Sequence, residues 1–169
     1  MNNEAFQENH NSIKGISTKV INAKISFNYK EVDTSISLKE LSDTIDWKYA
    51  KIFERELDMI KGIIVMFDIT NFKSYTTSKD WISFVQEKRQ DKNYSIILCG
   101  NKSDLDSKRV VAVDEVLSYT NSIKAAYFET SLMTGSNVIE LKKYILSKFN
   151  LEHNYKQEEK SNATSCYVF

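Results

Sequence analysis

Two continuous apolar runs, residues 62–68 and 94–100, constrain the fold more than any other feature of the sequence. Each has the length of one strand and lacks a polar face, which is typical of parallel strands covered by helices on both sides. Helical spacing of apolar residues follows at 78–89, 114–122 and 137–149, with a short strand expected at 125–129. This alternation predicts an α/β fold: a three-layer, mostly parallel sheet with helices on both faces.

The two ends of the chain give weaker patterns. Residues 20–27 and 32–41 alternate imperfectly and predict a hairpin turning near Tyr29, and residues 50–60 are compatible with a helix. After Leu151 the sequence becomes polar, so we expect one domain over 1–150 and a flexible tail over 151–169.

Composition excludes several classes of protein. The 169 residues carry 23 basic and 23 acidic side chains, so the chain has no net charge that would attract nucleic acid. It also lacks a basic stripe with interleaved aromatic residues, so nucleic-acid binding is not predicted. The two cysteines, Cys99 and Cys166, suggest no disulfide framework, which fits a reducing cytosol. No signal peptide and no apolar stretch long enough to cross a membrane are expected.

Polar residues come directly after two of the expected strands. Asn101-Lys102-Ser103-Asp104 follows the second apolar run, and Thr130-Ser131 follows the short strand. The carboxylate of Asp104 can accept two parallel hydrogen bonds from the ring N–H and exocyclic amine of guanine, whereas adenine offers no such pair of donors. The lysine stem can lie along the base, and the asparagine can tie neighbouring loops together. The alternative is an ordinary polar turn after a strand.

Three stretches carry a resemblance to the small GTPases, most closely to their Rab branch: "GIIVMFDITNFKSY", "IILCGNKSDLDSKRVV" and "YFETSLMTGSNV". The resemblance covers residues 62–149 and implies binding of GTP or GDP with Mg²⁺, trafficking effectors or regulators as partners, and a role in vesicle traffic. Where the family usually has Ala-Lys, Leu132-Met133 stand, which predicts a weakened hold on the base. The guanine-binding residues that the resemblance implies are Asn101, Lys102, Asp104, Ser131, Leu132 (through its amide) and Met133.

The phosphate-binding loop of the family is absent from this sequence. It needs Gly-x-x-x-x-Gly-Lys-Ser/Thr, and no two of the glycines, Gly15, Gly62, Gly100 and Gly135, have that spacing. Residues 6–18 resemble the switch segment that follows this loop. The small GTPase fold is therefore expected to be incomplete, lacking its first strand, either as a true truncation or through an incomplete gene model.

The second phosphate-contacting motif of the family, Asp-x-x-Gly-Gln, matches residues 43–47 by position. Asp43 is a possible magnesium-proximal residue, but Asp46 replaces the glycine and Trp47 replaces the glutamine. Trp47 cannot orient a water molecule as glutamine does, so hydrolysis is predicted to be weak or absent and no catalytic residue is assigned. The alternative for Ser42-Asp43 is the cap of a helix.

The last four residues, Cys166-Tyr167-Val168-Phe169, have the form of a prenylation box, and the terminal Phe points to a geranylgeranyl group. The alternative is a coincidental cysteine. Prenylation at Cys166 implies a cytoplasmic protein held peripherally on the cytosolic face of a membrane. Two rivals stay open: a nucleotide-free pseudo-GTPase that acts as a lipid-anchored protein-binding module, and a truncated product that is not stably folded.

Overall fold

The apolar runs form the two central parallel strands of the sheet, β3 (Gly62–Asp68) and β4 (Ser95–Asn101), in the computed structural model of the chain. The structure describes residues 16–27, 30–41, 57, 60–89, 91, 93–151 and 163–168. The short strand β5 (Ala126–Glu129) pairs with β4, also in parallel. Because both neighbours of β4 run in its own direction, the carboxyl ends of these strands share one edge of the sheet.

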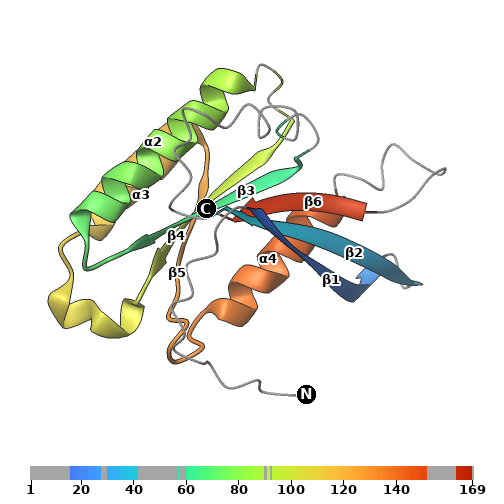
Figure 1. Ribbon diagram of the computed structural model, residues 1–169. Coiled ribbons are helices and arrows are strands. Elements are labelled where there is room, and N and C mark those ends of the chain that lie inside the picture. Colours follow the sequence, from blue (N-terminus) through green and yellow to red (C-terminus); the bar gives the residue numbers. More distant parts are fainter. Residues whose placement is uncertain are drawn as a thin grey trace.

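Three helices and one 3-10 helix connect or follow these strands (Figure 1). They are α2 (Phe72–Lys88), η2 (Ser103–Lys108), α3 (Val113–Ile123) and α4 (Val138–Leu151). Helix α2 begins before the predicted residue 78, because the side chain of Asn71 caps it by accepting a hydrogen bond from the Ser74 N–H at 3.2 Å. The prediction from residue 78 therefore missed the first turns of the helix, which include Phe72 and the buried Tyr75.

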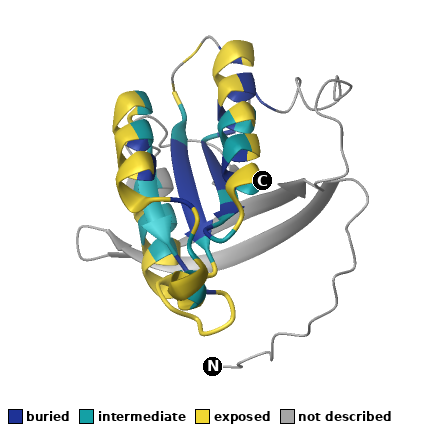
Figure 2. Ribbon diagram, turned by 90° about the vertical axis from the view of Figure 1, so that its left-hand side faces the viewer, coloured by how far each residue is buried: buried dark blue, intermediate teal, exposed yellow. Residues whose placement is uncertain are grey.

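Alternate residues of β3 and β4 pack against helices on opposite faces of the sheet. Ile63, Val65 and Phe67 belong to one core, together with residues of α2 and α3. Ile64 and Ile97 belong to the other, against α4. Figure 2 shows the buried residues gathered in the strands between the helices. Each fully buried aliphatic side chain contributes roughly 1.5–3 kcal/mol, so the two cores hold the three layers together. The predicted three-layer α/β architecture is confirmed.

The hairpin expected near the N-terminus is present as β1 (Ile16–Phe27) and β2 (Lys30–Leu41), which pair antiparallel from Phe27–Lys30 outward. The helix expected at 50–60 and the segment with Asp43, Asp46 and Trp47 fall largely or wholly outside the described residues. None of the helices in the described part of the chain is long and apolar enough to cross a membrane.

The C-terminal segment differs from its prediction as a flexible tail. Residues Ala163–Val168 form strand β6, which lies between β2 and β3 and runs parallel to both. The sheet order is β1-β2-β6-β3-β4-β5. Strand β6 occupies the position beside β3 on the side opposite to β4. Polar local composition predicted a tail because strand pairing depends on distant residues that composition does not report.

Candidate functional site

The polar loops after β4 and β5 meet at the shared carboxyl edge of the sheet. The Ser103 N–H donates to the Thr130 carbonyl at 3.0 Å, and the Leu132 N–H donates to Oδ1 of Asn101 at 3.2 Å. Closer to the sheet, the Thr130 N–H donates to the carbonyl of Gly100 at 2.8 Å. The structure thus ties together the two segments that the sequence singled out separately, and Asn101 makes one of the ties.

A side-chain contact also joins the loops, between Asp104 and Ser131. The Ser131 hydroxyl donates to Oδ1 of Asp104 and accepts from the Thr134 N–H at 3.1 Å. Ser131 is fully buried, whereas Asp104 is exposed. One carboxylate oxygen is therefore fixed while the other is open to a further donor. A carboxylate held in this way suits a ligand edge that presents two adjacent N–H groups.

Lys102, which the sequence predicted to lie along a base, is held by the end of β3. Its backbone adopts the left-handed conformation, with φ 67° and ψ 37°, and its Nζ lies 2.6 Å from Oδ2 of Asp68. The other oxygen of Asp68 accepts from the N–H and the hydroxyl of Thr70, at 2.8 and 2.7 Å. Burial alone would raise the pKa of Asp68, but the bonds from Lys102 and Thr70 together lower it. Asp68 is thus an ionised anchor for Lys102, a role that the sequence did not reveal.

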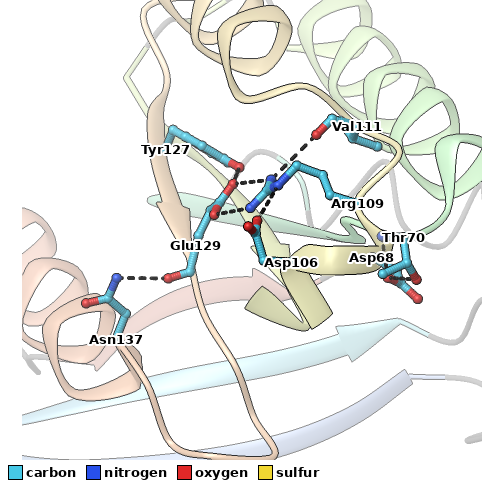
Figure 3. Close-up of polar contacts among 8 residues, drawn as sticks. All are labelled: Asp68, Thr70, Asp106, Arg109, Val111, Tyr127, Glu129 and Asn137. Carbon is cyan, nitrogen blue, oxygen red and sulfur yellow. Dashed lines mark hydrogen bonds and ion pairs between the residues drawn. The ribbon is translucent and has the colours of Figure 1, made fainter. Parts of the chain in front are cut away.

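An ion-pair cluster lies behind the two loops (Figure 3). Arg109 donates through Nη1 and Nη2 to both oxygens of Glu129 and through Nε to Asp106, each at 2.8 Å. The Tyr127 hydroxyl donates to Glu129, whose backbone carbonyl accepts from Nδ2 of Asn137 at 3.0 Å. Arg109 lowers the pKa of Glu129, despite its partial burial, and Glu129 in turn raises the pKa of Arg109. This cluster braces η2 against β5 and the loop before α4.

Sequence reasoning gave Arg109 and Glu129 no role. The only available signal was their placement, with Arg109 just after the first loop and Glu129 just before Thr130. If the loops after β4 and β5 lie side by side, the positive charge of Arg109 and the negative charge of Glu129 are brought close together.

Gly100 permits the close packing beneath the loops. A Cβ at this position would lie 3.0 Å from Cγ2 of Ile69, 3.0 Å from the Tyr127 hydroxyl and 3.1 Å from Cζ of Phe67. Such approaches are shorter than ordinary van der Waals contact, so glycine lets β4, β5 and the β3–α2 turn come this close, whereas a side chain would force its neighbours to shift by a few tenths of an ångström.

The remaining predicted residues divide between the exposed surface and undescribed parts of the chain. Leu132 and Met133 are 43% and 67% exposed beside the loops. Asp43 lies outside the described residues, and of Cys166 only the backbone, in β6, is described. Among the described residues, no three His, Cys, Asp or Glu side chains gather where a metal ion could bind.

Comparison with known proteins gives two results. A sequence profile of the Ras family matches residues 2–150. A shorter part is similar to Ras-related protein Rab-27A, 40% identical over 77 residues in Homo sapiens and 42% identical over 77 residues in Sus scrofa. Each of these matches covers 46% of this chain and 35% of the relative, so it spans about a third of the relatives' length.

Proposed function

Since this chain belongs to the Ras family, as a Rab-like member, we propose that its two joined loops bind the base of GTP or GDP. The observation that carries the proposal is the contact between Asp104 and Ser131, because it fixes a carboxylate at the edge where parallel sheets bind ligands. The loops at residues 101–104 and 130–133 supply specificity for guanine. Binding is expected to be weak overall, because the sequence has no phosphate-binding motif.

Each residue of the proposed base site has a distinct task. The carboxylate of Asp104 accepts from the ring N–H and the exocyclic amine of guanine, and Ser131 holds that carboxylate in place. The stem of Lys102 lies along the base while Asp68 retains its ammonium group. The amide of Leu132 donates to the guanine carbonyl oxygen, for which it must give up or share its 3.2 Å bond to Asn101. Met133 supplies only apolar contact.

The phosphate end of the nucleotide is held poorly under this proposal. Asp43, which lies outside the described residues, is the residue that would face Mg²⁺ through water, whereas Asp46 adds negative charge where the family presents a glycine amide to the terminal phosphate. Charge-assisted hydrogen bonds to phosphate are among the stronger contacts a nucleotide makes. We therefore expect affinity well below that of a complete GTPase, with hydrolysis weak or absent.

Family membership supports the cellular part of the proposal. The domain over 1–150 engages trafficking effectors or regulators, and a prenyl group on Cys166 places the protein peripherally on the cytosolic face of a membrane. A single lipid chain gives only marginal membrane affinity, so a partner or a lipid-shielding chaperone completes the attachment.

A second candidate is a nucleotide-free module that binds trafficking partners without cycling. The replacement of the motif glycine and glutamine by Asp46 and Trp47 favours it, because both changes act against the terminal phosphate. In this reading the fold persists as a lipid-anchored scaffold. A third outcome, a truncated product without a stable fold, is decided by the same experiment.

The test is a thermal melt of the full chain with GDP, GTP or ATP, each with Mg²⁺ or with a chelator. Ligand at about ten times Kd stabilises the folded state by roughly 1.4 kcal/mol, which is a measurable shift. We expect a shift with guanine nucleotides only, lost in Asp104→Ala and kept in the control Asp114→Ala, whose side chain is exposed in α3. A cooperative melt without a shift would favour the nucleotide-free module, and a melt without cooperativity would favour the truncated product.

A further inference from the structure

Strand β6 is the sole link in the described sheet between the hairpin β1–β2 and the parallel strands β3–β5. All six of its residues pair with β2, from Ser35–Ala163 to Glu40–Val168. On its other side it pairs with β3 from Gly62–Cys166 to Ile64–Val168. A segment from the far end of the chain therefore fills an interior strand position, with hydrogen-bonding neighbours on both sides.

The residues of β6 that have two strand partners are Cys166, Tyr167 and Val168. These are also the first three residues of the box Cys166-Tyr167-Val168-Phe169. The residues before them, Ala163 to Ser165, pair with β2 alone. The most firmly paired part of β6 is thus the part that a lipid transferase must recognise.

We infer that the slot between β2 and β3 is a strand-binding site whose ligand is the chain's own C-terminal segment, and that its occupation blocks lipid attachment at Cys166. The ligand class is an extended peptide that runs parallel to both walls of the slot. The blocking half of this inference rests on the proposed prenylation, whereas the docking half does not.

Docking and modification exclude each other because both use the same backbone. In the transfer, the Cys166 thiolate attacks the first carbon of an isoprenyl diphosphate. A sulfur–carbon bond forms, the carbon–oxygen bond breaks, inorganic diphosphate leaves with the electron pair, and the thiol proton passes to solvent. A transferase that reads the four residues must surround them, and residues 166–168 cannot enter its cleft while both neighbouring strands hold them.

Release of β6 has a structural cost, since it separates β2 from β3. Two interior strand edges then expose unpaired N–H and C=O groups, which is unfavourable in water and invites pairing with another chain. The docked state is therefore the resting state. A lipidated chain needs either a partner that covers both edges or the return of β6 with its lipid outside the sheet.

Hydrogen exchange of the full chain tests the docking half. We expect the amides of residues 164–168 to exchange at least about 100-fold more slowly than those of a free peptide with the sequence of residues 160–169, because interior strands exchange through larger openings than frayed ends do. Amides of Ile97–Cys99 in β4 report that the protein is folded. Unprotected amides at 164–168 in a chain with a protected β4 would overturn the inference.

The rate of lipid transfer tests the blocking half, with geranylgeranyl diphosphate and a geranylgeranyltransferase as probes. The full chain is compared with the double variant Thr164→Pro, Ser165→Pro, and both with free peptides of matching sequence. Successive N–H groups of a strand point to opposite neighbours, so the two prolines remove at least one bond to β2 without altering the box. We expect the variant chain to match its peptide and the wild-type chain to react at least about 100-fold more slowly than its own peptide, in proportion to its undocked fraction.

The outcomes separate the inference from the proposed prenylation. If neither peptide is modified, prenylation of Cys166 fails while hydrogen exchange still decides the docking. If both peptides and the wild-type chain react at one rate, docking does not block modification and that half is overturned. Should the double proline variant lose its β4 protection, the variant Ser165→Val replaces it. Its β-branched valine favours the strand more than serine does, and the variant is expected to react more slowly than wild type.

Discussion

Arg109 and Glu129 join the end of η2 to the end of β5 through two N–H···O bonds of 2.8 Å each. Their side chains are only 19% and 22% exposed, so the pair is more shielded from water than an ordinary surface salt bridge. The pair connects the segment that carries Asp104 to the strand that leads into Ser131. We infer that the relative position of the two loops depends on this contact.

Arg109→Lys tests the two-pronged geometry. An ammonium group keeps the charge but cannot donate to both carboxylate oxygens and to Asp106 at once. We expect the free energy of unfolding to fall by about 1–3 kcal/mol, as for other charged hydrogen bonds that lose a partner. Chemical denaturation measures this, with the exposed neighbour Lys108→Gln as control. If Arg109→Lys and Lys108→Gln lower the free energy of unfolding equally, the paired hydrogen bonds from Arg109 to Glu129 contribute nothing to stability.

Stability at low pH depends on Glu129. Because Arg109 lowers the pKa of this carboxyl below its ordinary 4.5, the unfolded state takes up its proton at a higher pH than the folded state does. The contribution is therefore present above about 4.5 and is lost as the pH falls through the folded value. Between about pH 6 and about pH 3, wild type should lose more stability than Glu129→Gln does. The Arg109→Lys background serves as control, and the difference between wild type and Glu129→Gln should shrink there, because the guanidinium that lowers the pKa of Glu129 is gone.

The sequence predicted those parts of the fold in which local pattern and final environment agree. The runs at 62–68 and 94–100 are apolar on both faces, and they form strands buried on both faces. Strand β6 could not be predicted in this way, because its partners Leu38 and Gly62 lie more than a hundred residues earlier in the chain.

The candidate site shows the same division. Asn101, Asp104 and Ser131 were found because their residue types carry chemistry in adjacent loops. The supports Asp68 and Arg109 were not, because an ion pair between distant charges leaves no local pattern. Sequence reasoning proposes the polar residues of the loops more readily than the ion pairs that hold the loops in place.

Gly100→Ala should destabilise the chain through crowding. The added methyl group would lie about 3 Å from Ile69, Tyr127 and Phe67, and overpacking of this kind costs roughly 1–3 kcal/mol. Tyr127→Phe removes one of the three clashing atoms, so the cost of Gly100→Ala, measured by chemical denaturation, should shrink in that background.

Gly135→Ala is the matched control for the crowding at Gly100. Its φ of +78° penalises any side chain, yet no atom lies within 4 Å of the added methyl group. The cost of Gly135→Ala should therefore be the same in the wild-type and the Tyr127→Phe backgrounds. A dependence on that background as large as the one at Gly100 would refute the crowding argument.

Tyr75→Phe should leave the chain at least as stable as wild type. Tyr75 belongs to α2, its side chain is fully buried, and its hydroxyl has no hydrogen-bond partner among the described residues. A buried hydroxyl without a partner costs on the order of 1–3 kcal/mol, and the ring contacts with Phe67 and Phe72 survive the change. Tyr119→Phe, at a half-buried ring nearby, is the control. A clear fall in melting temperature for Tyr75→Phe alone would mean that the hydroxyl is satisfied in solution.

Asp104→Asn tests whether the fixed carboxylate reads a base. An amide offers one acceptor and one donor where the carboxylate offers two acceptors. It therefore matches xanthine, which has a ring N–H beside a carbonyl oxygen, better than guanine. We expect the variant to lose stabilisation by GDP and to gain it with xanthosine diphosphate, each by at least about tenfold in Kd, because an unpaired buried donor or acceptor costs about 1–3 kcal/mol. Thermal melts with both nucleotides measure this, and Asp114→Asn, at an exposed position of α3, should keep the wild-type preference. Loss of both nucleotides in Asp104→Asn with an unchanged melt would show that this carboxylate supports the loop without selecting the base.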